Sequence, residues 1–235
     1  MRNTYFNFVP DLVVEATSVC DRSCAGCYAP NVVSTDDAQE LLEQKPNLFI
    51  KQEALNRALS EIEKPRDAKI RLIAVRGGEP TRHPQIAELL RVTAKFCSQL
   101  FLETHGRWIL SKDEFSKLVL DECFRLGVVI KLSFDKMHGG TNVPLRAMTT
   151  KLDELGIQYL IAITESTDAE FQLTRGLCDW VDDSKIIFQK KARKIEDLIL
   201  PQIGVVRVDG SLARSLNARS IMAESISTQK VGVVA

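Results

Sequence analysis

Short runs of apolar and β-branched residues recur along the chain and predict buried parallel strands. From the second run onward they return about every 29 residues, which is the length of one strand plus one returning helix. The six runs are residues 12–17, 69–75, 99–104, 128–134, 157–164 and 185–188. We therefore expect an alternating β/α chain with about six strands.

The segments between these runs carry apolar residues at helical spacing. Residues 55–62 place Leu55, Ala58, Leu59 and Ile62 at i, i+3, i+4 and i+7, and the same spacing returns in 86–97 and 115–126. Right-handed crossovers would curl such units into a partial (β/α)6 TIM-like barrel with parallel strands. Its active face would lie at the carboxyl ends of the strands, and the eight strands of a closed barrel are not visible in the pattern.

Local signals mark some element boundaries and the tail. Ser111 with Glu114, and Thr167 with Glu170, have the spacing of helix capping boxes. Residues 204–213 predict two short strands joined at an Asp-Gly turn. We therefore divide the chain into a core over 1–200 and a C-terminal hairpin and tail over 201–235.

Residues 29–47 form an insertion after the first predicted strand. Its middle has the composition of one or two helical turns. The insertion is either a lid over the strand ends or an ordinary surface loop, and the pattern alone leaves both readings open.

Composition narrows the class of protein. With 235 residues, of which 45% are hydrophobic and 26% charged, the chain can bury a sizeable core. Lys plus Arg and Asp plus Glu both total 31, so the net charge is zero and gives no reason to expect nucleic acid or an anionic membrane as partner. The N-terminal residues lack the apolar core of a secretory signal, and no apolar stretch has the length that spans a bilayer. We therefore expect a cytoplasmic protein.

Two groups of cysteines differ in their placement. Cys97, Cys123 and Cys178 are scattered through segments of helical periodicity, where a free cysteine acts as a small hydrophobic residue. The other three, Cys20, Cys24 and Cys27, follow the first predicted strand at spacing C-x3-C-x2-C. Only the second group brings three thiolates onto one short loop.

Three thiolates on a loop indicate a metal site. Thiolates select zinc, copper or iron–sulfur clusters. An ordinary four-iron cluster takes four cysteines, and no fourth lies near these three, so one iron would be left for a ligand from outside the protein. A structural zinc site also takes four ligands, for which Asp21 or a distant histidine are the remaining candidates.

Polar residues follow the next predicted strands. Gly77-Gly78-Glu79-Pro80 comes after the second strand, where glycines allow the backbone to approach a ligand and a carboxylate can hold an ammonium group. Thr104-His105-Gly106-Arg107 follows the third strand. All of these motifs fall at the same end of the predicted sheet as the cysteine loop.

The fourth and sixth strands add further candidates. Ser133 and Asp135, at i and i+2, project from one face and can meet one ligand, such as a ribose diol. His138 lies three residues further on, and Gln189 closes the sixth strand. Arg107, His138 and Gln189 are the candidates for substrate contact.

In combination these segments resemble the radical S-adenosylmethionine (SAM) superfamily over roughly residues 10–190. The resemblance rests on the three cysteines after the first strand, Gly77 to Pro80 after the second, and Ser133 with Asp135 on the fourth. It implies a [4Fe–4S] cluster held by Cys20, Cys24 and Cys27, with the amino and carboxylate groups of SAM on the open iron.

The resemblance also implies roles for single residues in the SAM site. The segment Gly77 to Pro80 would hold the SAM amino group, with Thr104 beside it, and Ser133 and Asp135 would approach the ribose. Ile163 on the fifth strand would form the adenine wall. The family often has an aromatic residue just before its third cysteine, whereas here that position is Gly26, so Tyr28 becomes the candidate contact.

The implied function is a radical SAM enzyme that draws one electron at a time from an external donor, such as flavodoxin or ferredoxin. Its substrate would be a peptide or protein side chain or a small metabolite. The tail resembles, without its cysteines, the C-terminal extension of peptide-modifying members. The competing interpretation is a non-catalytic scaffold that is stabilised by zinc or binds SAM without turnover.

Overall fold

The computed structural model describes residues 9–24, 27, 32–63, 69–135, 144–165, 167–190 and 203–214. The helical elements are α1 (Ala38–Gln44), η1 (Pro46–Leu48), α2 (Gln52–Glu63), η2 (Pro80–Arg82), α3 (Ile86–Ala94), η3 (Arg107–Leu110), α4 (Glu114–Leu126), α5 (Leu145–Glu154), α6 (Asp168–Gly176) and η5 (Asp183–Lys185). The strands are β1 (Leu12–Glu15), β2 (Val19–Cys20), β3 (Val32–Val33), β4 (Ile70–Arg76), β5 (Cys97–Thr104), β6 (Val129–Ser133), β7 (Tyr159–Glu165), β8 (Ile186–Lys190), β9 (Gly204–Val206) and β10 (Leu212–Arg214).

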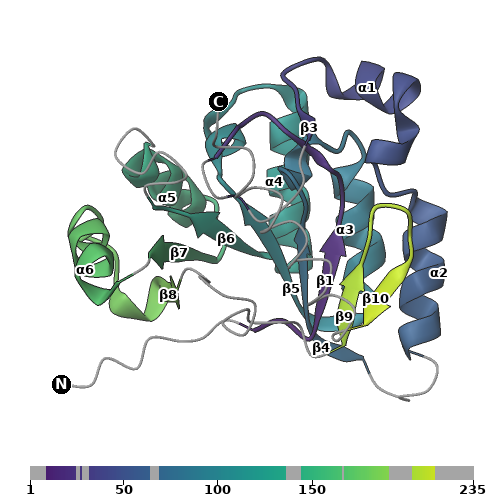
Figure 1. Ribbon diagram of the computed structural model, residues 1–235. Coiled ribbons are helices and arrows are strands. Elements are labelled where there is room, and N and C mark those ends of the chain that lie inside the picture. The colour runs from purple at the N-terminus through teal and green to yellow at the C-terminus, as the bar shows by residue number, and fades with distance from the viewer. Residues whose placement is uncertain are drawn as a thin grey trace, which may run out of the picture.

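The main sheet has eight strands in the order β10-β9-β1-β4-β5-β6-β7-β8 (Figure 1). The six strands predicted from the apolar runs are β1, β4, β5, β6, β7 and β8, and each pairs in parallel with the next. Among the described strands, β10 and β8 are the two edges, so the sheet does not close. The predicted partial TIM-like fold with parallel strands is confirmed.

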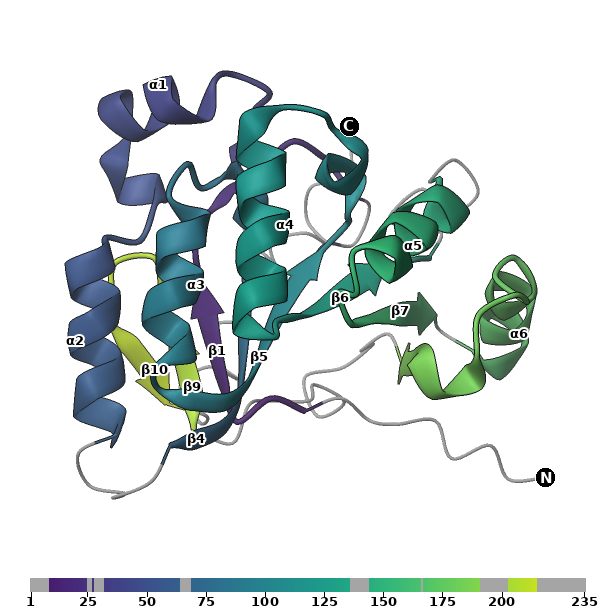
Figure 2. The same ribbon diagram turned by 180° about the vertical axis from the view of Figure 1, so that it is seen from behind.

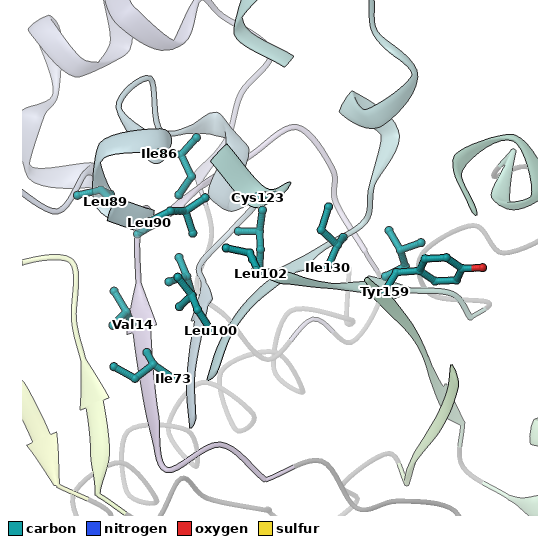
Figure 3. Packing of buried hydrophobic residues seen from close by; sticks show 14 of the residues in the cluster. Val14, Ile73, Ile86, Leu89, Leu90, Leu100, Leu102, Cys123, Ile130 and Tyr159 are labelled. Atoms are coloured by element: carbon teal, nitrogen blue, oxygen red, sulfur yellow. The ribbon is translucent and has the colours of Figure 1, made fainter. Parts of the chain in front are cut away.

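The main hydrophobic core lies between the sheet and its layer of helices. Figure 2 shows α2, α3 and α4 in front of the strands, on one face of the sheet. Val14, Ile73, Leu102 and Ile130 point from successive strands toward this layer, where they meet side chains such as Leu90 of α3 (Figure 3). All five side chains are completely buried. The helical periodicity predicted this contact, because apolar residues at i, i+3 and i+4 form one stripe.

The opposite face of the sheet is divided along the strands. Ala74, Phe101 and Val129 form a small buried apolar cluster there. Closer to the carboxyl ends, Glu103 of β5 lies opposite Lys131 of β6, with Lys131 Nζ 3.2 Å from Glu103 Oε1. This face therefore becomes charged toward the end at which the predicted motifs lie.

The predicted hairpin at the tail is confirmed as β9 and β10. These strands are antiparallel to each other, and β9 pairs in parallel with β1 through Val13 and Val205. Gly210 has φ +81° at the turn, and a Cβ there would lie 2.7 Å from Ala54 Cβ, so the tight turn and the contact with α2 both favour glycine. The hairpin thus extends the main sheet beside β1 (Figure 1).

Two local expectations were wrong. Cys97 is the first residue of β5 and not part of the preceding helix, which ends at Ala94. Ser111 does not cap α4, because the N-cap is Asp113, whose Oδ1 accepts a hydrogen bond of 2.6 Å from the Ser116 amide. A carboxylate two residues further along has taken the role predicted for the hydroxyl. At α6 the prediction holds, because Thr167 is the N-cap.

The insertion contains more regular structure than its composition indicated. α1 starts after Asp37, whose side chain accepts hydrogen bonds from two amides of the first turn. β3 pairs in parallel with β2 in a separate two-stranded sheet, with Val33 opposite Cys20. The insertion therefore contributes a strand next to the first cysteine of the loop. Among the described helices, none is both long and apolar enough to cross a bilayer.

Candidate active site

The cysteine loop starts from a short strand at the carboxyl end of β1. Cys20 ends β2 and is buried, while Cys24 and Cys27 are partly exposed. The amide of Cys27 donates a hydrogen bond of 3.1 Å to the Cys24 carbonyl, which turns the chain between them. The sequence therefore places the first cysteine on a strand and the other two on the irregular part of the loop.

The glycine pair after β4 contacts the backbone that leads into this loop. A Cβ on Gly77 would lie 2.3 Å from the Thr17 oxygen, and one on Gly78 would lie 2.2 Å from the Val19 oxygen. The amide of Gly78 donates to Thr17 O at 2.8 Å, and that of Glu79 donates to Val19 O at 2.9 Å. The close approach expected toward a ligand is thus an approach to the protein's own chain, directly before Cys20.

Glu79 has its carboxylate enclosed by donors of the protein. The residue is 2% exposed. Its Oε1 accepts hydrogen bonds from the hydroxyls of Thr81 at 2.8 Å and Thr104 at 2.7 Å. Its Oε2 accepts from the His105 amide at 3.1 Å. Glu79 therefore joins the ends of β4 and β5.

A histidine connects this junction to the cysteine loop. His105 is buried, and its Nε2 lies 2.8 Å from Asp21 Oδ1 and 3.2 Å from Glu79 Oε2. Its Nδ1 accepts a hydrogen bond from the Arg107 amide at 3.2 Å, so Nε2 carries the proton and donates it toward the carboxylates. Asp21 directly follows Cys20, and the pairing of these two residues was not visible in the sequence.

The charges of this pair shift each other's protonation. Burial by itself lowers the pKa of His105, but the carboxylates of Glu79 and Asp21 outweigh it, so the pKa is raised above its ordinary value. The hydrogen bond from His105 lowers the pKa of Asp21 in turn. An ionised Asp21 therefore lies next to the first cysteine over the neutral pH range.

Charged side chains lie near the thiols of Cys20 and Cys24. Burial, with a smaller contribution from Glu79 and Asp21, raises the pKa of Cys20 to about 12. Burial also raises the pKa of Cys24, and the cation of Arg22 opposes this rise. The Nη1 atom of Arg22 is buried and has no hydrogen-bond partner in the described part of the chain. The loop therefore carries a cation within electrostatic reach of a thiol.

Ser133 and Asp135 are at the end of β6, as predicted. Ser133 is partly exposed, and Asp135 is completely buried. Asp135 is among the negative groups that raise the pKa of Cys24, after burial and Cys27. The end of β6 therefore lies within electrostatic reach of the cysteine loop, although Asp135 and Cys24 are 111 positions apart in the sequence.

Other predicted site residues lie in different surroundings. Ile163 of β7 is fully buried in the main hydrophobic core. Thr104 donates to Glu79 and accepts from the Trp108 indole at 3.0 Å, so its hydroxyl is used internally. Pro80 is buried as the first residue of η2.

The candidates for substrate contact are spread around the carboxyl ends of the strands. Arg107 is exposed at the start of η3, and Gln189 is partly exposed on β8, opposite Thr164. Tyr28 and His138 lie outside the described residues. The structure thus joins the cysteine, Gly-Gly-Glu and Asp135 segments and leaves Arg107 and Gln189 at the margin of the site.

Charged residues that the sequence did not indicate as candidates lie on the face of the sheet that points away from the helices. Glu15 is opposite Arg76 on β4, as Glu103 is opposite Lys131 on β6. Burial lowers the pKa of Lys131, although Glu103 partly compensates. The strand positions could have revealed these residues, because each has the parity that points away from the helices.

Among the described residues, no three His, Cys, Asp or Glu side chains converge in the manner of ligands to one metal ion. A structural zinc site requires such convergence, since four ligands surround one ion in a tetrahedron. A four-iron cluster binds each cysteine through a different iron, so its thiolates need not converge on one point. The arrangement of the described residues is compatible with a cluster, and these residues form no preformed zinc site.

Comparison with known proteins gave matches at the level of structure. No protein-family model matches the sequence, and the search of curated proteins found no match. The solved structure of polyhistidine-tagged anSMEcpe with bound AdoMet is similar at TM-score 0.56 and 16% identity, covering 77% of this chain and 51% of that one. Two structures of SuiB from Streptococcus suis are similar as well. The one bound to the precursor peptide SuiA has TM-score 0.56, 15% identity and coverage of 80% and 40%, and the one bound to S-adenosylmethionine has TM-score 0.54, 13% identity and coverage of 80% and 42%.

These structures share the fold of this chain, and two of them hold AdoMet or S-adenosylmethionine. At such low identity the likeness shows the fold alone. The chain spans about half or less of the length of the anSMEcpe and SuiB structures named above.

Proposed function

We propose that this chain is a radical SAM enzyme with a [4Fe–4S] cluster held by Cys20, Cys24 and Cys27. The main observation behind this proposal is that the ends of β4 and β6 both come close to the cysteine loop. Glu79 from the end of β4 and Asp135 from the end of β6 both lie within electrostatic reach of cysteines in this loop. A fold similar to that of radical SAM enzymes supports the same class.

The residues of the loop suit an anionic cluster. Thiolates are soft ligands for iron–sulfur clusters, and coordination would keep Cys20 and Cys24 deprotonated despite their raised pKa values. The buried Nη1 of Arg22, which has no partner in the described structure, offers a positive charge next to Cys24. A cation there favours the additional negative charge of a reduced cluster.

When bound, the reduced cluster and SAM supply reductive cleavage of the SAM sulfonium to methionine and a 5′-deoxyadenosyl radical, which abstracts hydrogen from a substrate. The chain binds and orients these groups. Ser133 and Asp135 would contact the SAM ribose, and Tyr28 is the candidate contact next to the third cysteine. The Gly77 to Pro80 segment would hold the SAM amino group.

Within that segment, the Glu79 side chain and the backbone would have different roles. The carboxylate of Glu79 already accepts four hydrogen bonds, from the amide and hydroxyl of Thr81, the hydroxyl of Thr104 and the amide of His105. Glu79 would therefore act mainly by holding the Gly77 to Pro80 segment rigid. Backbone carbonyls of this segment would then face the ammonium group of SAM. Preorganised dipoles of this kind bind a charged ligand without reorganisation on binding.

The substrate would be a peptide or protein side chain or a small metabolite. A peptide is supported by the similar structures of SuiB with its precursor peptide and of native anSMEcpe with a Cp18Cys peptide. Arg107, His138 and Gln189 are the candidate substrate contacts. An external one-electron donor, such as a flavodoxin or ferredoxin, would reduce the cluster.

Anaerobic reconstitution tests the proposal. We expect about four irons per chain, a change in the EPR signal of the reduced cluster when SAM is added, and 5′-deoxyadenosine formation with dithionite. Asp135→Ala should retain the iron and raise the dissociation constant of SAM. Stoichiometric zinc without iron or sulfide after anaerobic expression would contradict the proposal and favour a scaffold protein.

A further inference from the structure

The first cysteine of the loop is held on both sides. Before Cys20, the backbone is bound by the amides of Gly78 and Glu79, as described above. After Cys20, the carboxylate of Asp21 is bound by His105 Nε2 at 2.8 Å. Cys20 is therefore enclosed between two contacts that come from the ends of β4 and β5.

His105 is itself fixed in orientation. Its Nδ1 is held by the Arg107 amide, and its own amide is held by Glu79. The side chain is 7% exposed, so water has little access to replace it. A ring fixed at both its backbone and its Nδ1 holds Nε2 in one direction, toward the carboxylates of Asp21 at 2.8 Å and Glu79 at 3.2 Å, of which Asp21 is the nearer.

A purely stabilising role explains this arrangement poorly. A buried group of charged and polar side chains is often no more stable than apolar residues of similar volume. The contact of His105 is also made to the residue adjacent to a proposed cluster ligand and to no part of the helix-facing core. The position of the contact thus points to the cysteine loop.

We infer that His105 is a positioning residue that fixes Cys20 through Asp21. The inference rests on the proposed function, because it gives the fixed thiol its purpose as the anchored ligand of the cluster. Neutral His105 suffices for this role, since its Nε2–H already donates to Asp21.

The first experiment uses the chain without iron and measures alkylation of Cys20 by mass spectrometry. A buried thiol reacts only through local opening, so a weaker anchor should expose it more often. We expect His105→Phe and Asp21→Ala each to speed alkylation of Cys20 about tenfold, the size expected for loss of a charge-assisted hydrogen bond. Cys97 in the same sample serves as the internal reference and should react at an unchanged rate.

His83→Phe is the matched control. His83 is also a buried histidine, 1% exposed, but its Nε2 lies 3.0 Å from the Ile50 carbonyl and does not reach the loop. It should leave the Cys20 rate unchanged. Equal acceleration in His83→Phe and His105→Phe would overturn the inference, and so would Cys20 rates within about twofold of wild type in the folded loop variants.

Two further variants show whether the two residues act as one contact. The double variant of His105→Phe and Asp21→Ala should be no faster than either single variant, because both remove the same bond. His105→Gln, whose amide can donate to Asp21, should lie closer to wild type than His105→Phe. Additive single effects would contradict the inference. If His105→Phe failed to fold, Asp21→Ala would decide, because the Asp21 side chain is 30% exposed.

The reconstituted protein gives a second readout. We expect His105→Phe to retain most of its iron but to change the EPR spectrum of the reduced cluster with SAM, because the anchored thiol has moved. An unchanged spectrum would contradict the inference. Wild-type protein that assembles no cluster would refute the proposed function and leave the alkylation result standing, so the two failures are distinguishable.

Discussion

Comparison of the two groups of three cysteines shows that the burial and pKa of a thiol do not by themselves reveal its role. Burial raises the pKa of Cys20 to about 12, and it does the same for Cys123 in the helix layer. Cys123 is surrounded by the apolar side chains of the main core (Figure 3). Cys20 instead lies next to Asp21 and within reach of Glu79. The difference between a core cysteine and a candidate ligand is in the polar groups around it.

The same contrast appears for the remaining cysteines. Cys97 and Cys178 direct their thiols to backbone carbonyls of the preceding turn, that of Thr93 at 3.6 Å and that of Arg175 at 3.4 Å. These contacts are local and need no further partner. Cys24 is within electrostatic reach of groups from distant strands. A thiol whose charged neighbours come from several strand ends is thus a candidate for chemistry, whereas one that donates to a backbone carbonyl three or four residues earlier is not.

The largest expected effect separates these groups by function. Alanine in place of Cys20, Cys24 or Cys27 should abolish cluster-dependent SAM cleavage, because a cluster with two protein ligands is not retained in place. Cys97→Ala should leave cleavage largely intact. Iron content and 5′-deoxyadenosine formation measure both outcomes, and the reverse pattern would show that the wrong ligands had been chosen.

A smaller effect is expected in thiol reactivity without metal. At pH 8, Cys24 and Cys27 should be alkylated about a hundredfold faster than Cys123, because they are partly exposed and Cys123 reacts only after the core opens. Mass spectrometry of the alkylated peptides gives each rate. Similar rates for all three would mean that the loop is packed as tightly as the core, which would remove the contrast between the two groups.

Glycine substitution tests the junction that supports the loop. Gly78→Ala should lower the free energy of unfolding by about 1–3 kcal/mol, because its Cβ would lie 2.2 Å from the Val19 oxygen and the backbone must move. Gly176→Ala is the control in the helix layer, since a Cβ there meets no atom within 4 Å. That change should raise stability by up to about 1 kcal/mol. Urea denaturation measures both, and equal effects would contradict a close approach at Gly78.

The smallest expected effect concerns a carboxylate of the helix layer. Hydrogen bonds from Arg91 and Arg125 lower the pKa of Glu122 from 4.5 to about 2. Since the folded state holds the ionised form, this contribution to stability is complete above pH 4.5 and is lost as the pH falls toward 2. The difference in unfolding free energy between wild type and Glu122→Gln should therefore shrink over that range. A difference that stays constant from pH 7 to pH 2 would show that the two ion pairs add no stability.

Local sequence patterns were sufficient for most of the fold. The six apolar runs correspond to the six parallel strands, because period and length reflect burial on both faces of a sheet. Errors occurred where neighbouring signals compete, as at Ser111, where Asp113 two residues later offers a stronger acceptor for the amides of the helix. Boundaries of this kind depend on which of two nearby side chains binds first-turn amides, and periodicity carries no information about that.

By itself, the sequence determined the parallel α/β architecture and which segments hold the candidate chemistry, because these follow from local periodicity and from the order of strands. Only the tertiary structure decided how those segments meet. It placed Gly77 and Gly78 against the chain before Cys20, and it turned Ile163 into the core. It also joined Asp21 to His105 across 84 residues. Such contacts depend on strand register and on the path of each loop, which no single segment of the sequence specifies.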